Sequence, residues 1–207
     1  MTIHVHDIDI GGYAEIGVAS NFSFLRGASH PQDYVHQASI EGLHAIGIAD
    51  HNTMAGVVRA YAELDNKDLV YKPKLLIGTR LVFNDGTPDV LAYPRDRDAY
   101  GRLCRLLSKG KLRADKGECH LMFGDLAEFS EGQLLVLMPA YRLAVSLLKE
   151  TLDALLQMPA AGIWLGVSMY HRGDDKRRLA GLQHIAASAR VPRTRFSSPG
   201  RYETASK

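Results

Sequence analysis

Short apolar runs alternate with longer amphipathic segments along this chain. The short runs are bounded by glycine, proline or polar residues, which is typical of buried strands. They predict strands at residues 13–19, 44–49, 74–78, 133–138 and 163–168. A further pair of runs, residues 81–83 and 90–93, flanks the dipeptide Asp85-Gly86, and this arrangement predicts a hairpin.

The longer segments place apolar side chains three or four positions apart, which is the spacing of one helical face. Leu148, Leu152 and Leu155 illustrate the pattern in one of these segments. Helices are expected at residues 32–40, 53–64, 98–109, 141–158 and 174–190. Because strands and helices alternate, the sequence predicts an α/β fold, either a parallel sheet or an α/β barrel.

The alternation breaks down after Pro192. An α/β chain should supply another apolar strand here, but residues 193–201 are mostly polar and include a proline and a glycine. We therefore expect a divergent, disordered tail over residues 193–207. A barrel without its closing strand would be a curved sheet of five or six strands, with residues 13–19 and 163–168 as open edges.

Composition places the chain among ordinary globular proteins. Of its 207 residues, 46% are hydrophobic and 23% are charged, which excludes disordered and collagen-like classes. The two cysteines, Cys104 and Cys119, exclude a disulfide scaffold and a four-cysteine zinc site. No apolar run approaches the roughly 20 residues of a membrane span, and the first residues do not resemble a signal peptide. We expect a cytoplasmic protein without membrane partners.

The formal net charge of +2 is too small to indicate a nucleic-acid partner by itself. Residues 95–118 nevertheless hold eight lysines or arginines against four acidic residues. Such a stretch either contacts phosphates or forms the solvated face of a helix and its loop. The residues considered for phosphate contact are Arg102, Arg105, Lys109, Lys111, Arg113 and Lys116.

Asp50-His51-Asn52 is the most suggestive candidate site, because it follows a predicted buried strand. Ligands of α/β proteins bind at that end of the strands. A carboxylate and an imidazole there could hold a divalent metal or act as acid and base. Alternatively, Asp50 caps the following helix and His51 is a loop residue.

Other chemical signals are weaker. His4-Val5-His6 matches a His-x-His metal pattern, but it lies in residues 1–12, interpreted here as an N-terminal extension. Cys119 and His120 are interpreted as structural or solvent-facing.

The sequence contains no P-loop, no GxGxxG and no GxSxG pattern, so nucleotide-binding loops and a hydrolase elbow are not supported.

Several ordered motifs resemble those of one family. They are Ser20-Asn21-Phe22-Ser23-Phe24-Leu25-Arg26-Gly27-Ala28-Ser29-His30-Pro31, Ile48-Ala49-Asp50-His51-Asn52-Thr53-Met54-Ala55-Gly56, Leu76-Ile77-Gly78 and Lys116-Gly117-Glu118-Cys119-His120-Leu121. Over residues 13–192 the chain resembles the N-terminal PHP (polymerase and histidinol phosphatase) domain of bacterial error-prone DNA polymerases of the polymerase III alpha-subunit type. The resemblance implies a distorted (β/α)7 barrel, expected here to be incomplete at its C-terminal end.

The resemblance also implies a metal site, because catalytic PHP domains bind zinc or manganese and hydrolyse phosphoesters. At four of the implied ligand positions this chain has residues that do not ligate metals: Gly17, Ala19, Arg26 and Arg80. The positions that keep polar side chains are Asp50, His51 and Asp89. Met138-Pro139-Ala140 stands where a cysteine is implied, and His4-Val5-His6 lies too early in the chain to be the opening pair.

Arg26 and Arg80 would bring positive charge to the place where cations would bind. We therefore expect no metal or other cofactor in this chain, and an arginine paired with Asp50 or Asp89 instead. The resemblance implies a structural and interaction module of a polymerase in damage-induced translesion synthesis. The Mg²⁺-dependent polymerase active site is not in this chain. Its implied partners are the rest of the polymerase and mutagenesis accessory proteins, with weak, non-specific DNA binding at most.

Two other functions remain open on the sequence. The chain could be a stand-alone metal-dependent PHP phosphoesterase, which Asp50, His51 and the barrel favour. It could also be a truncated gene product without a function, which the unusual residues after Pro192 favour.

Overall fold

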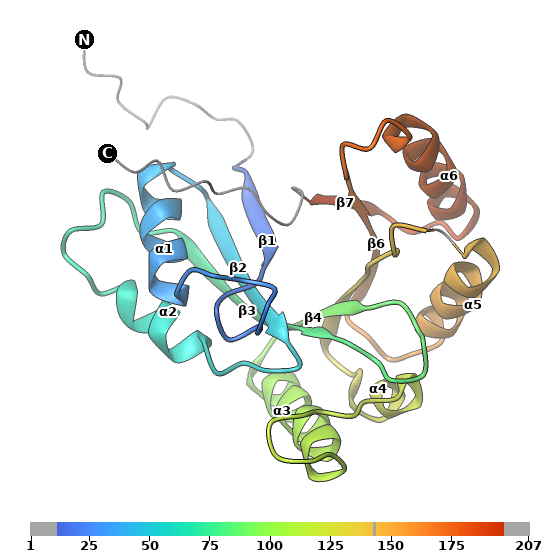
Figure 1. The fold of residues 1–207 in the computed structure, drawn as a ribbon, viewed down its shortest axis with the longest axis horizontal. Coiled ribbons are helices and arrows are strands. Elements are labelled where there is room, and N and C mark those ends of the chain that lie inside the picture. The colour runs from blue at the N-terminus through green and yellow to red at the C-terminus, as the bar shows by residue number, and fades with distance from the viewer. Residues whose placement is uncertain (1–11, 143, 197–207) are drawn as a thin grey trace.

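A computed structural model describes residues 12–142 and 144–196 of the chain. These residues form one seven-stranded sheet with helices packed around it (Figure 1). The strands are β1 (Ala14–Val18), β2 (Ala45–His51), β3 (Lys74–Leu81), β4 (Val90–Pro94), β5 (Gln133–Leu137), β6 (Gly162–Ser168) and β7 (Arg193–Phe196). The helices are α1 (Pro31–Ile40), α2 (Val57–Glu63), α3 (Arg97–Leu112), α4 (Phe123–Phe129), α5 (Val145–Leu156) and α6 (Asp175–Ser188).

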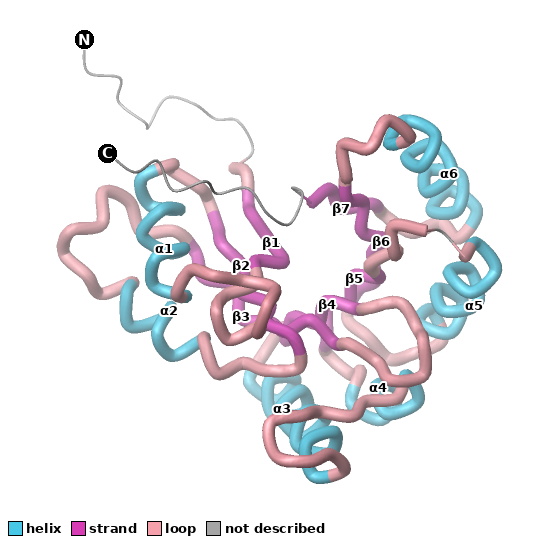
Figure 2. The backbone as a smooth tube through the Cα atoms, viewed as in Figure 1, coloured by secondary structure: helices cyan, strands magenta, loops and turns pink. Residues whose placement is uncertain are grey.

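The sheet follows the order of the chain from β1 to β7 and curls into an open barrel (Figures 1 and 2). Strands β1, β2 and β3 are parallel, as are β5, β6 and β7. Strand β4 is antiparallel to both of its neighbours, so the sheet is mixed and not purely parallel. The predicted hairpin is confirmed as β3–β4, and the predicted α/β, incomplete barrel is confirmed as well.

Strand β7 corrects the prediction for the C-terminal region. Residues Arg193–Phe196 were expected to be disordered, but they pair in parallel with β6 from Leu165 to Ser168. Strand pairing uses backbone groups, so a polar segment can serve as an edge strand even without an apolar face. The second edge of the sheet is therefore β7 and not β6, and the expectation of five or six strands was too low. The remaining tail, residues 197–207, lies outside the described residues.

Two clusters of buried side chains lie between the sheet and its helices. One joins β2 to α1 and α2, with Val35, Ile46 and Ile48 among its members. The larger one joins β3–β6 to α3–α6. Helix α4 was not predicted, because its seven residues are too few to show a clear helical period.

The concave face of the sheet carries a separate core around Tyr93 of β4, which is buried. The Gly17 amide donates a hydrogen bond to the Tyr93 hydroxyl, at 3.0 Å. At Gly78 an added Cβ would lie 2.5 Å from the Tyr93 ring, so this position requires glycine. Gly17 has φ of +93°, a backbone conformation that also favours glycine.

Candidate functional site

The candidate site lies at the carboxyl end of β2, on the concave face of the sheet. His51 is the last residue of β2 and is in register with Arg80 of β3. The Arg80 Nε atom donates to the Asp89 carboxylate, at 2.7 Å. The ion pair expected from charge alone is therefore present, with Asp89 and not Asp50 as the partner.

His51 is half-buried beside this ion pair. Burial lowers the pKa of its imidazole below the ordinary value of 6.5, and the nearby Arg80 cation lowers the pKa further. Asp89 opposes this effect, and Arg26 adds to it. A neutral imidazole can accept or donate a hydrogen bond at neutral pH, but the adjacent arginine disfavours a bound cation.

Asp50 faces the opposite side of the sheet from His51, because neighbouring residues of a strand point to opposite faces. Its side chain is only 1% exposed. The carboxylate accepts hydrogen bonds from the Ser20 amide at 2.7 Å, the Ser20 hydroxyl at 2.8 Å and the Ser23 hydroxyl at 2.6 Å. Asp50 therefore fixes the loop after β1, and the predicted Asp50–His51 site does not form.

The loop that Asp50 fixes exposes large apolar side chains. Phe24 is 85% exposed and Leu25 is 86% exposed, and Leu25 has a left-handed φ of +59°. Arg26 follows in the same loop and is exposed. The Ser23 hydroxyl also accepts a hydrogen bond from the His51 amide, at 3.0 Å, so the loop is attached directly to the end of β2.

Asn52 is a site residue that the sequence reasoning did not single out for a role. Its side-chain amide donates to the Val82 carbonyl and its carbonyl accepts from the Val82 amide, each at 2.9 Å. This pair of bonds continues the β2–β3 ladder past the last strand residue. Asn52 has a φ of +51°, which asparagine tolerates better than most residues, and this preference was the available signal.

The metal that the resemblance implies does not fit the residues found here. Gly17 and Ala19 have no side-chain atom that can ligate a metal, and the Gly17 amide is bonded to the Tyr93 hydroxyl. Asp89 is engaged by Arg80, and Asp50 lies on the other face. Within residues 12–142 and 144–196, no three histidine, cysteine, aspartate or glutamate side chains are placed to hold a metal ion. His4 and His6 lie outside the described residues.

A cleft of about 550 Å³ opens beside His51. Phe22, Asn52 and Thr53 line one side of it together with His51. The other side is formed by residues of the segment after α3: Lys111, Asp115, Lys116, Gly117, Glu118 and Cys119. The fold thus brings Lys111 and Lys116, two of the predicted phosphate contacts, to the same cleft as His51.

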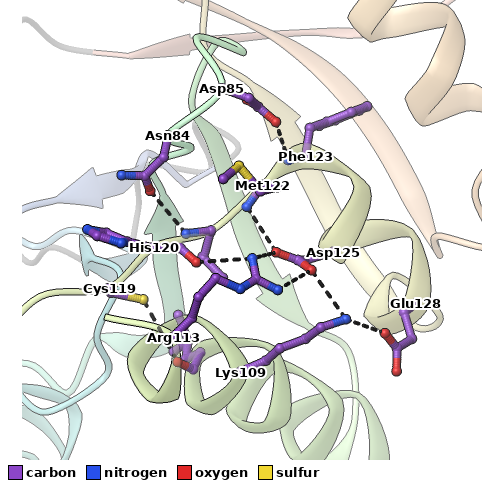
Figure 3. Close-up of polar contacts among 12 residues, drawn as sticks. Asn84, Asp85, Lys109, Arg113, Cys119, His120, Met122, Phe123, Asp125 and Glu128 are labelled. Carbon is purple, nitrogen blue, oxygen red and sulfur yellow. Dashed lines mark hydrogen bonds and ion pairs between the residues drawn. The ribbon is translucent and has the colours of Figure 1, made fainter. Parts of the chain in front are cut away.

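Three of the other predicted phosphate contacts are engaged by carboxylates. Arg102 lies 3.5 Å from the Glu131 carboxylate, and Lys109 lies 2.6 Å from Glu128. Arg113 lies 2.7 Å from Asp125 (Figure 3). Arg105, Lys111 and Lys116 are exposed. The basic stretch therefore divides into a paired part that holds the structure together and an exposed part.

Asp125, which the sequence reasoning missed, is the centre of the paired part (Figure 3). Its carboxylate accepts two hydrogen bonds from Arg113 and one from the Met122 amide, and it forms an ion pair with Lys109 at 3.2 Å. Arg113 is the main reason that the pKa of Asp125 lies well below its usual range. The signal in the sequence was an aspartate at the third position of a short helix, which caps the first turn.

Cys119 and His120 lie in the segment attached by this network. The Cys119 thiol donates weakly to the Leu107 carbonyl, at 3.8 Å, and burial raises the pKa of the thiol. The His120 imidazole lies 3.1 Å from the Glu118 carboxylate. Cys119 and His120 thus contact the segment's own backbone and side chains.

Comparison with known proteins identifies the family. The PHP domain family matches residues 16–156. The chain belongs to the PHP domain family. An error-prone DNA polymerase of Rhodopseudomonas palustris (strain BisB5) is 66% identical over 183 residues, which are 88% of this chain and 16% of the polymerase. An error-prone DNA polymerase of Bradyrhizobium sp. (strain ORS 278) is 62% identical over 185 residues, covering 87% of this chain and 16% of the polymerase.

This PHP domain spans about a sixth of the length of these curated relatives. Among solved structures, a protein assigned as a metal-dependent phosphoesterase from Bifidobacterium adolescentis has a similar fold, with a TM-score of 0.64. It is 18% identical, and the match covers 93% of this chain and 90% of that protein. In the part of the chain that the structure describes, no helix is long and apolar enough to cross a membrane.

Proposed function

We propose that this PHP domain is the N-terminal module of an error-prone DNA polymerase and serves a structural, metal-free role in damage-induced translesion synthesis. The high identity to polymerases of about six times its length supports this assignment. In this proposal the chain works in the cytoplasm, and its partners are the rest of the polymerase and mutagenesis accessory proteins. The polymerase active site and its Mg²⁺ belong to the rest of that protein.

The Arg80–Asp89 ion pair is the observation that supports a role without a bound metal. A cluster of divalent cations needs several anionic or neutral ligands to offset the repulsion between the metals. Here a guanidinium occupies the strand end beside His51 and engages Asp89 at 2.7 Å. The ion pair holds β3 to the segment before β4, so it stabilises the concave face without any bound cation.

A stand-alone metal-dependent phosphoesterase is the second candidate. The cleft beside His51, with Lys111 and Lys116 on its far side, favours this function because lysines can hold a phosphate group. The shared fold with the Bifidobacterium adolescentis protein is compatible with it. The two candidates differ in whether the chain needs metal.

Metal content and hydrolysis together distinguish the candidates. We expect the dialysed 207-residue chain to hold well under one zinc, manganese or iron per chain by elemental analysis. We also expect no hydrolysis of p-nitrophenyl phosphate above buffer when Zn²⁺ or Mn²⁺ is added. Two or more metals per chain, or hydrolysis that EDTA abolishes, would favour the phosphoesterase. His51→Gln is the control variant, because it removes the imidazole that lines the cleft among the described residues and should abolish any hydrolysis that belongs to this site.

A further inference from the structure

A cluster of two tyrosines and two arginines lies away from the His51 cleft, at the carboxyl ends of β5 and β6. Tyr141 follows β5 and Tyr170 follows β6, and these strands are parallel neighbours (Figure 1). The two rings meet edge to face, with centroids 5.2 Å apart. The Arg172 guanidinium lies 4.7 Å from the Tyr141 ring centroid, and that of Arg178 lies 4.9 Å from the Tyr170 centroid.

Arg178 forms the buried base of this cluster. Its side chain is only 6% exposed, and it donates to the backbone carbonyls of Ser168 at 2.8 Å and of Pro139 and Ala140 at 3.0 Å each. Among the described residues no carboxylate forms an ion pair with it, and its Nε atom has no hydrogen-bond partner. Arg178 therefore fixes the two loops and the Tyr170 ring through hydrogen bonds to backbone carbonyls and through its contact with the ring face.

The outer part of the cluster is accessible. Tyr141 and Tyr170 are half-buried, and Arg172 is exposed. Residues 139–142 and 169–178 together hold five lysines or arginines and two aspartates, so the local charge is positive. One of the aspartates, Asp175, accepts a hydrogen bond from the Tyr170 amide at 2.8 Å and thereby helps to hold the loop.

We propose that this cluster binds single-stranded nucleic acid. Every base presents an aromatic face, so a fixed tyrosine ring can stack on it with little dependence on sequence. Arg172 can stack on the same base or pair with the adjacent phosphate, because its guanidinium is planar and charged. The Tyr170 ring is held in advance by Arg178, and the Tyr141 ring packs against Tyr170, so binding costs little side-chain entropy. The site is separate from residues 95–118, where Arg102, Lys109 and Arg113 are engaged by carboxylates.

Fluorescence anisotropy with labelled oligothymidine tests the proposal on the 207-residue chain. An oligomer of about 20 nucleotides is long enough to cover one such site. We expect Arg172→Ala and Tyr141→Leu each to weaken binding by about fivefold or more, because each removes a stacking partner. Arg105→Ala is the matched control, since it removes one exposed positive charge from α3 and should change the Kd by less than about twofold. Equal effects of Arg172→Ala and Arg105→Ala would overturn the proposal.

An abasic oligomer of the same length separates stacking from charge attraction. It keeps every phosphate but lacks the bases, so we expect it to bind at least about fivefold more weakly than oligothymidine. Equal affinity for the two oligomers would show non-specific attraction to phosphate and would overturn the stacking site. Arg172 is exposed, so its variant should keep the thermal unfolding midpoint of the parent chain. The metal-free role proposed above does not depend on this outcome.

Discussion

At the scale of residues, Asp50 and His51 have different environments although they are neighbours in β2. Asp50 accepts three hydrogen bonds from serines on the helix-covered side of the sheet, whereas His51 faces the Arg80–Asp89 pair on the concave side. Charge alone predicted that an arginine here would pair with Asp50 or Asp89, and the structure shows Arg80 paired with Asp89. The sequence could not predict the role of Asp50, because Ser20 and Ser23 reach it only through a loop whose path depends on tertiary contacts.

The pKa of His51 provides a test of this arrangement. We expect Arg80→Gln to raise the pKa of His51 towards or above 6.5, because the variant removes a nearby cation and leaves the Asp89 anion unpaired. In the parent chain His51 has a lower pKa in the folded state than in the unfolded state. As the pH drops below about 6.5, the unfolded state therefore takes up a proton at His51 before the folded state does, and the stability of the fold should decrease. This loss should be smaller in Arg80→Gln. NMR titration of the His51 ring proton measures the pKa, with His51→Gln to assign the signal.

Arg95→Gln is the control for that titration, since it removes one exposed arginine outside the site and should leave the His51 pKa unchanged. An unchanged or lower pKa in Arg80→Gln would show that Arg80 does not set the charge state of His51.

At the scale of elements, side-chain contacts attach the segment between α3 and α4 to α4 and to the β3–β4 connection. Arg113 and Lys109 of the α3 end bind Asp125 of α4, and the Leu121 amide donates to the Asn84 side chain of the β3–β4 connection at 3.1 Å (Figure 3). These contacts hold the cleft wall that includes Lys116 and Cys119. The sequence predicted α3 from its apolar period, but short α4 and this network depend on side chains that meet only after folding.

Asp125→Asn should release that segment. The amide cannot pair with two cations, so we expect trypsin to cleave after Lys116 about tenfold faster, with the cleavage sites outside residues 109–118 unchanged. The lowered pKa of Asp125 also indicates that its ionised carboxylate stabilises the folded state. This contribution to stability is fully present above the ordinary pKa of an aspartate and is lost as the pH falls through the lower folded-state pKa. Asp115→Asn in the same segment is the matched control. Equal cleavage rates in the two variants would contradict the role of Asp125.

At the scale of the whole molecule, the alternation of strands and helices predicted an α/β fold, and the family resemblance narrowed it to an incomplete distorted barrel. Neither predicted that β4 is antiparallel to both of its neighbours. The edge of the sheet at β7 was harder to predict, because this strand is polar and joins the sheet through backbone pairing with β6. Apolar patterns report which side chains are buried, but they give no signal for a strand whose backbone alone completes a sheet. Among the described pairings, β1 and β7 are not joined, so each presents an edge of the curled sheet.

A chimera tests the proposed module in its larger context. Residues 13–192 of this chain replace the matching region of the Rhodopseudomonas palustris (strain BisB5) polymerase, with which the chain is 66% identical. We expect primer extension within about threefold of the parent polymerase, because volume-conserving changes between close relatives cost little stability. Deletion of the same region is the control and should abolish extension. A chimera that purifies as a folded monomer but cannot extend primers would contradict the proposal.

The backbone at Gly17 makes the residue hard to replace. With φ at +93° and its amide bonded to Tyr93, this position penalises any residue with a side chain. A histidine introduced here would have to refold the end of β1 before its imidazole could serve as a ligand. If an ancestor of this chain bound metal through residue 17, recovery of that ligand would require coordinated changes in β1 and at Tyr93. A single substitution at residue 17 would therefore not create a metal ligand in this chain.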